Sequence, residues 1–372
     1  MIMPKDLLKP LTSLRFFAAL WVVLYTYIKE LYPPVHFGLI DKGYLGVDLF
    51  FILSGFILSY VYLEAFGERR FDYREFVVNR LARVYPLHLA TLLFTLLLIA
   101  GAALKGVQLD PNAANWQALP AHLLLMQSWG LAPSAAFNHP SWSISAEWFA
   151  YLTFPATAAV AWRLRERPIL AVGLAAGFLI GLNLVFSAVA GFNLTHATFQ
   201  WGALRIVPSF LFGAALYLAW RGGAVASPWL ARFGTASASL IVIAAASFGA
   251  DRPHIDILIV LALGLMILSV AGMDRDGPGV LSSKIFVYLG EISFATYMIY
   301  VPWKWVFLKA VHAVLNLGDE GLPFTWWLAG LLALVPLSML AHHLIELPFR
   351  RIVRLWAAPL VNKLGYKTAK QR

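Results

Sequence analysis

Residues 11–27, LTSLRFFAALWVVLYTY, form an apolar stretch that carries a single charge, Arg15. A helix needs roughly 20 predominantly apolar residues to cross a bilayer, so this stretch is close to a complete span. Nine similar segments follow it. The ten segments lie at 11–28, 44–62, 84–104, 142–162, 168–188, 204–220, 235–250, 254–272, 285–308 and 323–346. The sequence therefore predicts an all-α polytopic membrane protein with about ten transmembrane helices, organised as a single domain over residues 1–372.

The composition supports this class of protein. Hydrophobic residues make up 60% of the 372 residues, charged residues make up 13%, and the mean hydropathy is +0.72. A soluble domain is typically about 25% charged. The chain has no cysteine, which excludes disulfides, thiolate metal sites and cysteine nucleophiles. Zinc-protease and P-loop motifs do not occur either, so we predict no metal and no permanently bound cofactor.

The net charge of +10 is explained by membrane topology, because the basic residues fall in the connections between the apolar segments. With a cytoplasmic N-terminus, the inner connections hold most of the 29 Lys and Arg residues, and the positive-inside rule places both termini in the cytoplasm. The basic tail, residues 348–356, is suited to anionic lipid. No charge pattern is left that would indicate nucleic acid. The first segment lacks a cleavage site and is expected to remain as a signal anchor.

Charged residues inside spans need a reason, because each costs about 2.5–3.5 kcal/mol at the centre of a helix. Thr26 lies about 16 Å beyond Arg15 along a helix and about 20° away in angle, so the two share a face. Arg15 either snorkels to the cytoplasmic headgroups or faces the interior. Arg80 and Arg83 share a face at a cytoplasmic entrance. Paired arginines grip phosphates, which favours a phosphate-bearing cytoplasmic ligand over topology alone.

Carboxylates at other span ends suggest partners for the buried arginines. Glu147 follows Ser143 by four residues on one face, and it is either paired with an arginine or a proton acceptor. Arg15 and Arg205 have candidate partners in Asp48, Glu147 and Glu291, and Glu346 closes the last span. We expect these charges to face an internal cavity, with Glu147 in the same cavity as Arg15 and Thr26. The glycine after Ser54 is read as a position of close helix packing.

Six motifs resemble the successive signatures of the acyltransferase-3 family, membrane proteins that O-acylate bacterial surface sugars. They are LTSLRFFAALWVVLY, GVDLFFILSGFIL, NRLARVYPLHL, WSISAEWFAYLTFP, LGEISFATYMIYVP and IELPFRR. The resemblance implies ten spans in the bacterial cytoplasmic (inner) membrane. It also implies acetyl-CoA or another acyl-CoA as a cytoplasmic co-substrate. The acceptor that the resemblance implies is a sugar, a polysaccharide or a lipid-linked glycan, presented at the outer face.

The resemblance carries roles over to particular residues. Arg15 matches the arginine of the first motif, and Arg80 and Arg83 match an Arg-x-x-Arg pair associated with the donor. Trp142, Ser143, Ser145 and Glu147 match a Trp-Ser-x-Ser-x-Glu signature. The implied mechanism has a base at position 26, helped by Glu147 or Asp48, and buried donors such as Ser145 at the oxyanion. The remaining polar residues assigned to the cavity or its support are Ser54, Arg205, Glu291, Ser293, Tyr300 and Glu346.

The chain departs from the family at the expected base. The family has a histidine at the position of Thr26, and a second family histidine is replaced by Tyr300. An unassisted threonine hydroxyl cannot act as a general base near neutral pH. Either the chain is a catalytically inactive member, or another group such as Glu147 or His139 deprotonates the sugar.

A sugar or lipid transporter would also hold charges in a cavity, but no inverted repeat is visible. The isolated histidines are read as polar residues at span boundaries, and nothing predicts an oligomeric state. These histidines are His36, His88, His196, His254 and His312.

Overall fold

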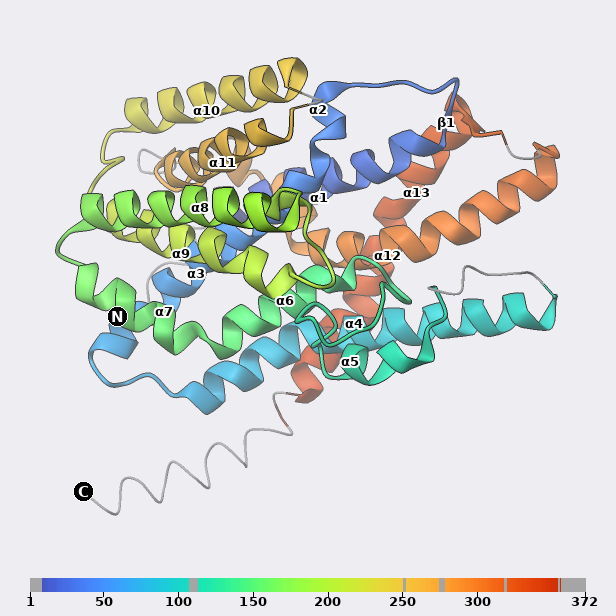
Figure 1. Ribbon diagram of the computed structural model, residues 1–372, viewed down its shortest axis with the longest axis horizontal. Helices are drawn as coiled ribbons and strands as arrows, with labels where there is room; N and C mark the ends of the chain where they lie inside the picture. The colour runs from blue at the N-terminus through green and yellow to red at the C-terminus, as the bar shows by residue number, and fades with distance from the viewer. Residues whose placement is uncertain are drawn as a thin grey trace.

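The computed structural model describes residues 9–106, 113–249, 252–273, 278–317, 320–353 and 355. Most of this is helical (Figure 1). The helices are α1 Lys9–Tyr27, α2 Gly38–Asp41, α3 Gly46–Gly67, α4 Tyr73–Leu104, α5 Leu119–Leu123, α6 Ser141–Leu152, α7 Phe154–Leu164, α8 Pro168–Ala190, α9 Gly202–Arg221, α10 Pro228–Phe248, α11 Asp256–Val270, α12 Lys284–Leu315 and α13 Phe324–Ala341. Both ends of the chain lie outside the described residues, so the cytoplasmic location of the termini and the contact of residues 348–356 with anionic lipid stay predictions.

Eight helices among the described residues are long and apolar enough to cross a membrane. The predicted all-α polytopic class is therefore confirmed. Of the other two predicted segments, 254–272 contains the 15-residue helix α11. The segment 142–162 is divided into α6 and α7 at Thr153, where Pro155 in the first turn of α7 has no N–H to continue the helical ladder.

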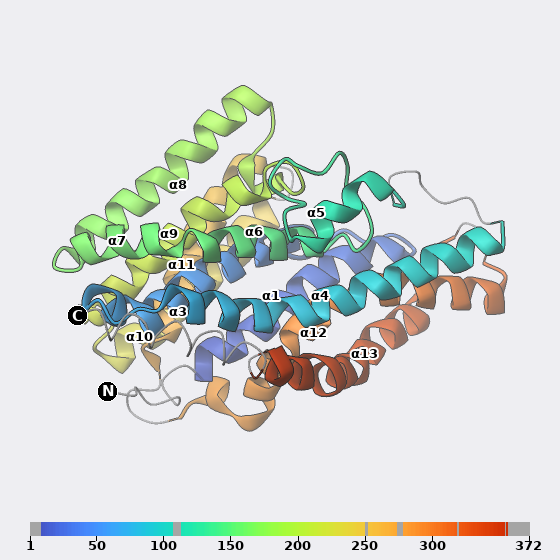
Figure 2. The ribbon, with the colours of Figure 1, turned by 90° about the horizontal axis from the view of Figure 1, so that it is seen from below.

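Helix α4 begins eleven residues before the predicted span. Its N-terminus is capped by Asp72, whose carboxylate accepts hydrogen bonds from the backbone N–H groups of Arg74 (2.8 Å) and Glu75 (3.0 Å). The 32-residue helix is about 48 Å long and exceeds the roughly 30 Å hydrocarbon layer. The C-terminal ends of α4 and α12 accordingly extend furthest in both ribbon views (Figures 1 and 2). Because the helix starts early, Arg80 and Arg83 lie on a rigid helical face.

The centre of the bundle is built on close helix pairs. Helix α3 packs along α9 and α1 packs along α12, whereas α8 and α10 lie at the periphery (Figures 1 and 2). At the α3–α9 crossing, a Cβ added to Gly55 would collide with the carbonyl oxygen of Phe210, and one added to Gly213 would collide with that of Ile52. The packing role predicted for Gly55 is confirmed, and it holds α3 firmly beside the site.

The connections at one end of the bundle are also tied down. Residues Leu31–Tyr32 and Leu322–Pro323 form a two-stranded parallel pair, β1 and β2, and Lys304 makes a 2.6 Å ion pair with Glu30. The long connection between α4 and α6 includes α5 and packs on α6.

Candidate active site

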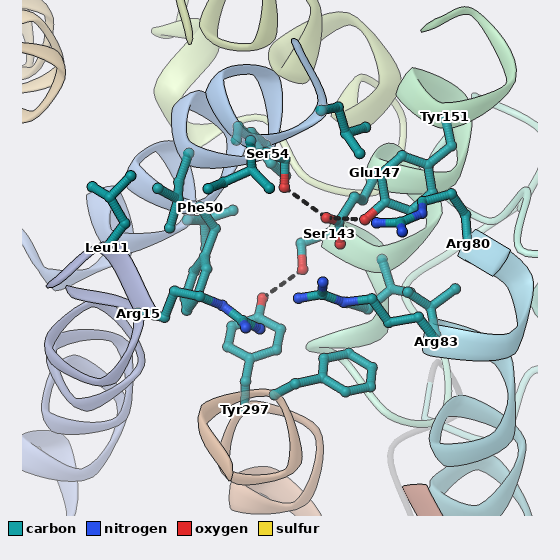
Figure 3. A pocket seen from close by; sticks show the side chains of 18 of the residues that line it. Leu11, Arg15, Phe50, Ser54, Arg80, Arg83, Ser143, Glu147, Tyr151 and Tyr297 are labelled. Atoms are coloured by element: carbon teal, nitrogen blue, oxygen red, sulfur yellow. Dashed lines mark hydrogen bonds between the residues drawn. The ribbon is translucent and has the colours of Figure 1, made fainter. Parts of the chain in front are cut away.

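A cavity of about 180 Å³ lies between α1, α3, α4, α6 and α12. Figure 3 shows most of the side chains that line it. The full lining consists of Leu11, Thr12, Arg15, Val47, Phe50, Phe51, Leu53, Ser54, Ile57, Leu58, Arg80, Arg83, Val84, Ser143, Ile144, Glu147, Tyr151, Phe294 and Tyr297. From Val47 to Leu58 the cavity follows α3 for about 16 Å. It therefore extends through a large part of the bundle.

One carboxylate and three guanidinium groups line the cavity. Glu147 accepts hydrogen bonds from the hydroxyl of Ser54 (2.7 Å) and from that of Tyr151, both on Oε1 (Figure 3). Arg15, Arg80 and Arg83 surround the remaining space. The lining is positive overall, so the chemistry of the site favours an anionic ligand.

Aromatic rings and a second carboxylate support the arginines from behind. The guanidinium carbon of Arg80 lies 5.7 Å from the ring centre of Tyr62 and 5.9 Å from those of Phe76 and Tyr151, which are cation–π distances. The buried carboxylate of Glu346 interacts electrostatically with both Arg15 and Arg83. It is held at 2.8 Å from Nδ1 of His342 within the π-helical turn His342–Glu346. Glu346 thus supports the site without lining it.

Two hydroxyl groups mark another part of the cavity wall. The Ser143 hydroxyl donates a 2.8 Å hydrogen bond to the Tyr297 hydroxyl, and the Tyr297 ring lies 6.0 Å from that of Phe50 (Figure 3). The rings of Tyr297 and Tyr300 are 5.8 Å apart. Here the cavity offers neutral hydrogen-bonding groups among aromatic rings, unlike the arginine-lined part.

Thr26 is not among the residues that line the cavity. Its hydroxyl donates to the carbonyl oxygen of Val22 (3.1 Å) and lies beside the side chain of Tyr300. Arg15 and Glu147 share the cavity as expected, but the expectation that Thr26 shares it is wrong. The reason is the position of Thr26 along α1, because it lies about three helical turns beyond Arg15, the α1 residue that lines the cavity. The two positions that match family histidines therefore contact each other.

Asp48 faces away from the cavity, and its expected role as a helper of the base finds no support in its position. Its carboxylate is buried and forms a 2.6 Å ion pair with Arg205, as the sequence predicted for these charges. Arg205 also donates to the carbonyl oxygens of Ala197 (3.0 Å) and Tyr44 (3.3 Å) and lies over the Trp142 ring at 5.1 Å. Asp48 compensates a buried charge and joins α3 to α9.

Three further expectations need correction. The hydroxyl of Ser145 accepts the backbone N–H of Ser128 at 3.0 Å, so it faces the outer connection and does not line the cavity. Glu291 is exposed on α12 and does not face an internal cavity. Ser293 donates to the carbonyl oxygen of Gly290 (2.7 Å) within its own helix. Each side chain points away because its helix turns a different face to the cavity.

Sequence reasoning missed two residues of the cavity, Tyr151 and Tyr297. Tyr151 follows Glu147 by four residues on the same helix, so spacing alone was a usable signal. Tyr297 comes near Ser143 only through the packing of α12 on the rest of the bundle, and no local signal indicates it. Among the described residues, no group of three or more His, Cys, Asp or Glu side chains is arranged to hold a metal ion.

Comparison with known proteins decides the family. The model of the acyltransferase domain called acyltransferase-3 matches residues 10–343. The chain belongs to the acyltransferase-3 family. The acyltransferase MdmB of Streptomyces mycarofaciens is 30% identical to it over 93% of this chain and 92% of the relative. No solved structure matches the chain.

Other relatives of this acyltransferase are longer proteins. The peptidoglycan O-acetyltransferase OatA of Listeria monocytogenes is 24% identical over 91% of this chain and 55% of the relative. The putative peptidoglycan O-acetyltransferase YrhL of Bacillus subtilis is 30% identical over 39% of this chain and 23% of the relative. The chain thus spans almost all of MdmB and about half of OatA.

Proposed function

We propose that this membrane acyltransferase moves an acyl group, acetyl by default, from cytoplasmic acyl-CoA to a sugar hydroxyl of a surface polysaccharide or glycolipid. The observation that carries the proposal is the convergence of Arg15, Arg80 and Arg83 on one cavity that contains a single lining carboxylate. Three guanidinium groups suit a ligand with several phosphate charges, because each can bind phosphate oxygens in pairs. The phosphates of CoA supply such charges.

The shape of the cavity supports a donor that enters from one side and an acceptor that enters from the other. Under the predicted topology, the arginines of α1 and α4 belong to the cytoplasmic half, while Val47 and Ser143 stand near the outer ends of their helices. A pantetheine arm can follow α3 between these regions. The names of the relatives OatA and YrhL support a sugar acceptor for this chain. The proposed location is the bacterial cytoplasmic membrane.

Acyl transfer to a hydroxyl requires stabilisation of an oxyanion and removal of a proton. The Tyr297 hydroxyl accepts the hydrogen bond of Ser143 and keeps its own O–H in the cavity wall to donate to the oxyanion. Thr26 supplies no base. Glu147 lines the cavity, with its Oε1 engaged by two hydroxyls, and His139 is exposed on the connection that precedes α6. The second candidate function, an inactive family member, is favoured by one observation, the threonine at position 26.

The proposal can be tested with inside-out vesicles from a bacterial host that lacks other surface O-acyltransferases. Labelled acetyl-CoA is added to the cytoplasmic face, and ester-linked label is counted in glycans extracted from the vesicles. Label above that of vesicles without the protein supports the proposal. Label equal to that control, at verified membrane expression, contradicts it and favours the inactive alternative. Glu147→Gln and His139→Gln variants then show whether either residue acts as the base, through losses of about 10²–10⁴-fold.

A further inference from the structure

A polar cluster outside the cavity joins three connections of the chain. At its centre is Asp256, the first residue of α11, whose side chain is fully buried. It accepts hydrogen bonds from the ammonium of Lys42 (2.8 Å) and from the hydroxyls of Tyr44 (2.7 Å) and Thr195 (2.7 Å). Under the predicted topology, all three connections are at the outer face.

His196 is the member of this cluster that reaches the surface. Its Nε2 lies 3.3 Å from Oδ2 of Asp256 and 3.1 Å from the hydroxyl of Tyr44, and its ring packs on that of Tyr44 at 4.6 Å. Its side chain is 45% exposed, whereas that of Asp256 is 0% exposed. Because Nε2 faces the cluster, Nδ1 is the nitrogen that a hydroxyl from outside can approach.

A buried carboxylate behind a half-exposed imidazole is the arrangement that prepares a general base. With the proton of neutral His196 on Nε2, beside the Tyr44 hydroxyl (3.1 Å) and the Asp256 carboxylate (3.3 Å), Nδ1 is the acceptor, and the carboxylate stabilises the imidazolium that forms. A purely structural role would be served by Lys42 and Thr195 alone, since both reach Asp256 directly. The exposed ring adds the ability to accept a proton from an approaching molecule.

The cluster also lies close to the outer end of the cavity. Tyr44 lies in the 3-10 turn Gly43–Leu45 that leads into α3, three residues before the cavity residue Val47. The Tyr44 ring contacts that of Tyr25 at 5.5 Å, and Tyr25 is the neighbour of Thr26 in α1. His196 is therefore near the helix end where the family carries its histidine and this chain does not.

We propose that His196, oriented by Asp256, is the general base for the acceptor hydroxyl, an inference that rests on the proposed acyl transfer. Nδ1 takes the hydroxyl proton as the oxygen bonds to the thioester carbonyl carbon, and the C–S bond then breaks. The CoA thiolate takes up a proton, and the imidazolium returns its proton to solvent. The products are the O-ester and free CoA.

The test compares His196→Gln, His196→Ala and a matched control, His254→Gln, in vesicles supplied with labelled acetyl-CoA. His254 is an exposed histidine two residues before Asp256, and it lies outside the cluster. We expect His196→Gln to lose about 10²–10⁴-fold in transfer with unchanged acetyl-CoA binding, and His254→Gln to transfer like the unaltered chain. Added imidazole should restore part of the transfer in His196→Ala, because it fills the space left by the side chain.

The outcomes separate this inference from the function on which it rests. If the unaltered chain transfers acetyl and His196→Gln is as active as His254→Gln, the base is elsewhere and the inference is overturned. If His196→Gln loses transfer and acetyl-CoA binding together, and imidazole restores nothing in His196→Ala, the residue is structural and the inference is also overturned. If the unaltered chain itself transfers nothing, the proposed function fails and the inference fails with it.

Discussion

Ser54 and Glu147, 93 residues apart in the chain, are joined by a 2.7 Å hydrogen bond across the cavity wall. The bond links α3, which is fixed against α9 by two glycines, to the short helix α6. Because Tyr151 donates to the same carboxylate oxygen, Glu147 is held on one side and presents its charge to the three arginines. Glu147 is the only carboxylate among the described residues of the cavity lining, and its position is thus set by the packing of α3 and α6.

Removal of this bond should weaken the fold measurably. We expect Ser54→Ala to lower the free energy of unfolding by about 1 kcal/mol, the usual net worth of an intramolecular hydrogen bond. The matched control is Ser59→Ala on the same helix, because the Ser59 hydroxyl is buried and has no hydrogen-bond partner in the described part of the chain. Thermal unfolding in detergent is the measurement. Equal losses of stability in the two variants would show that the bond to Glu147 contributes nothing.

The arginine pair of α4 should control donor binding. Charge reversal of Arg80 and Arg83 to glutamate places two carboxylates where phosphates are proposed to bind, so we expect acetyl-CoA binding to fall below detection by calorimetry. The matched control is Arg163→Glu, which alters an exposed arginine at the end of α7 outside the cavity. Binding that survives the double reversal at a normal unfolding temperature would place the donor elsewhere.

The pair of Asp48 and Arg205 should matter for stability. Asp48→Asn keeps the shape of the side chain but leaves the buried guanidinium of Arg205 without a counter-charge, which typically costs about 3–5 kcal/mol. We expect a large fall in unfolding temperature in detergent, and a normal rate of transfer per folded molecule. Glu166→Gln is the control, because its side chain is 78% exposed and its removal leaves no buried charge. A stable Asp48→Asn protein with a large loss in rate would restore the catalytic role expected for Asp48.

The sequence predicted the helices well because bilayer length and hydropathy act on each segment separately. Arg15, Arg80, Arg83 and Glu147 were brought together correctly, since a charge in a span must face either the interior or a helix end. The break at Thr153 was missed, although Pro155 was a visible signal.

Side-chain direction was harder to predict than helix position. Whether Asp48 or Ser145 faces the cavity depends on the rotation of its helix about its own axis, which is set by packing against helices distant in sequence. His196 was read as an ordinary boundary residue for a related reason. Its partners Tyr44 and Asp256 lie 152 and 60 residues away along the chain, and only the folded bundle brings them together.

A histidine restored at position 26 should rescue the loss of His196. Thr26 stands at the family position of the base and contacts Tyr300 at the outer part of α1. A neutral imidazole can accept a hydroxyl proton near pH 7 and typically contributes about 10²–10⁴-fold in rate. We therefore expect Thr26→His to raise transfer of labelled acetyl, both in the unaltered chain and in the His196→Gln background, where the relative gain should be larger.

The comparison needs Thr26→Ala at matched membrane expression, because loss of the hydroxyl also removes the contact with Tyr300. Thr26→Ala should transfer like the unaltered chain, since threonine provides no base. If Thr26→His raises transfer only when His196 is intact, the two positions act on different steps. If it raises transfer in neither background while His196→Gln remains impaired, a base at position 26 is not within reach of the acceptor. The acceptor hydroxyl is then deprotonated at the His196 cluster and not at the family position.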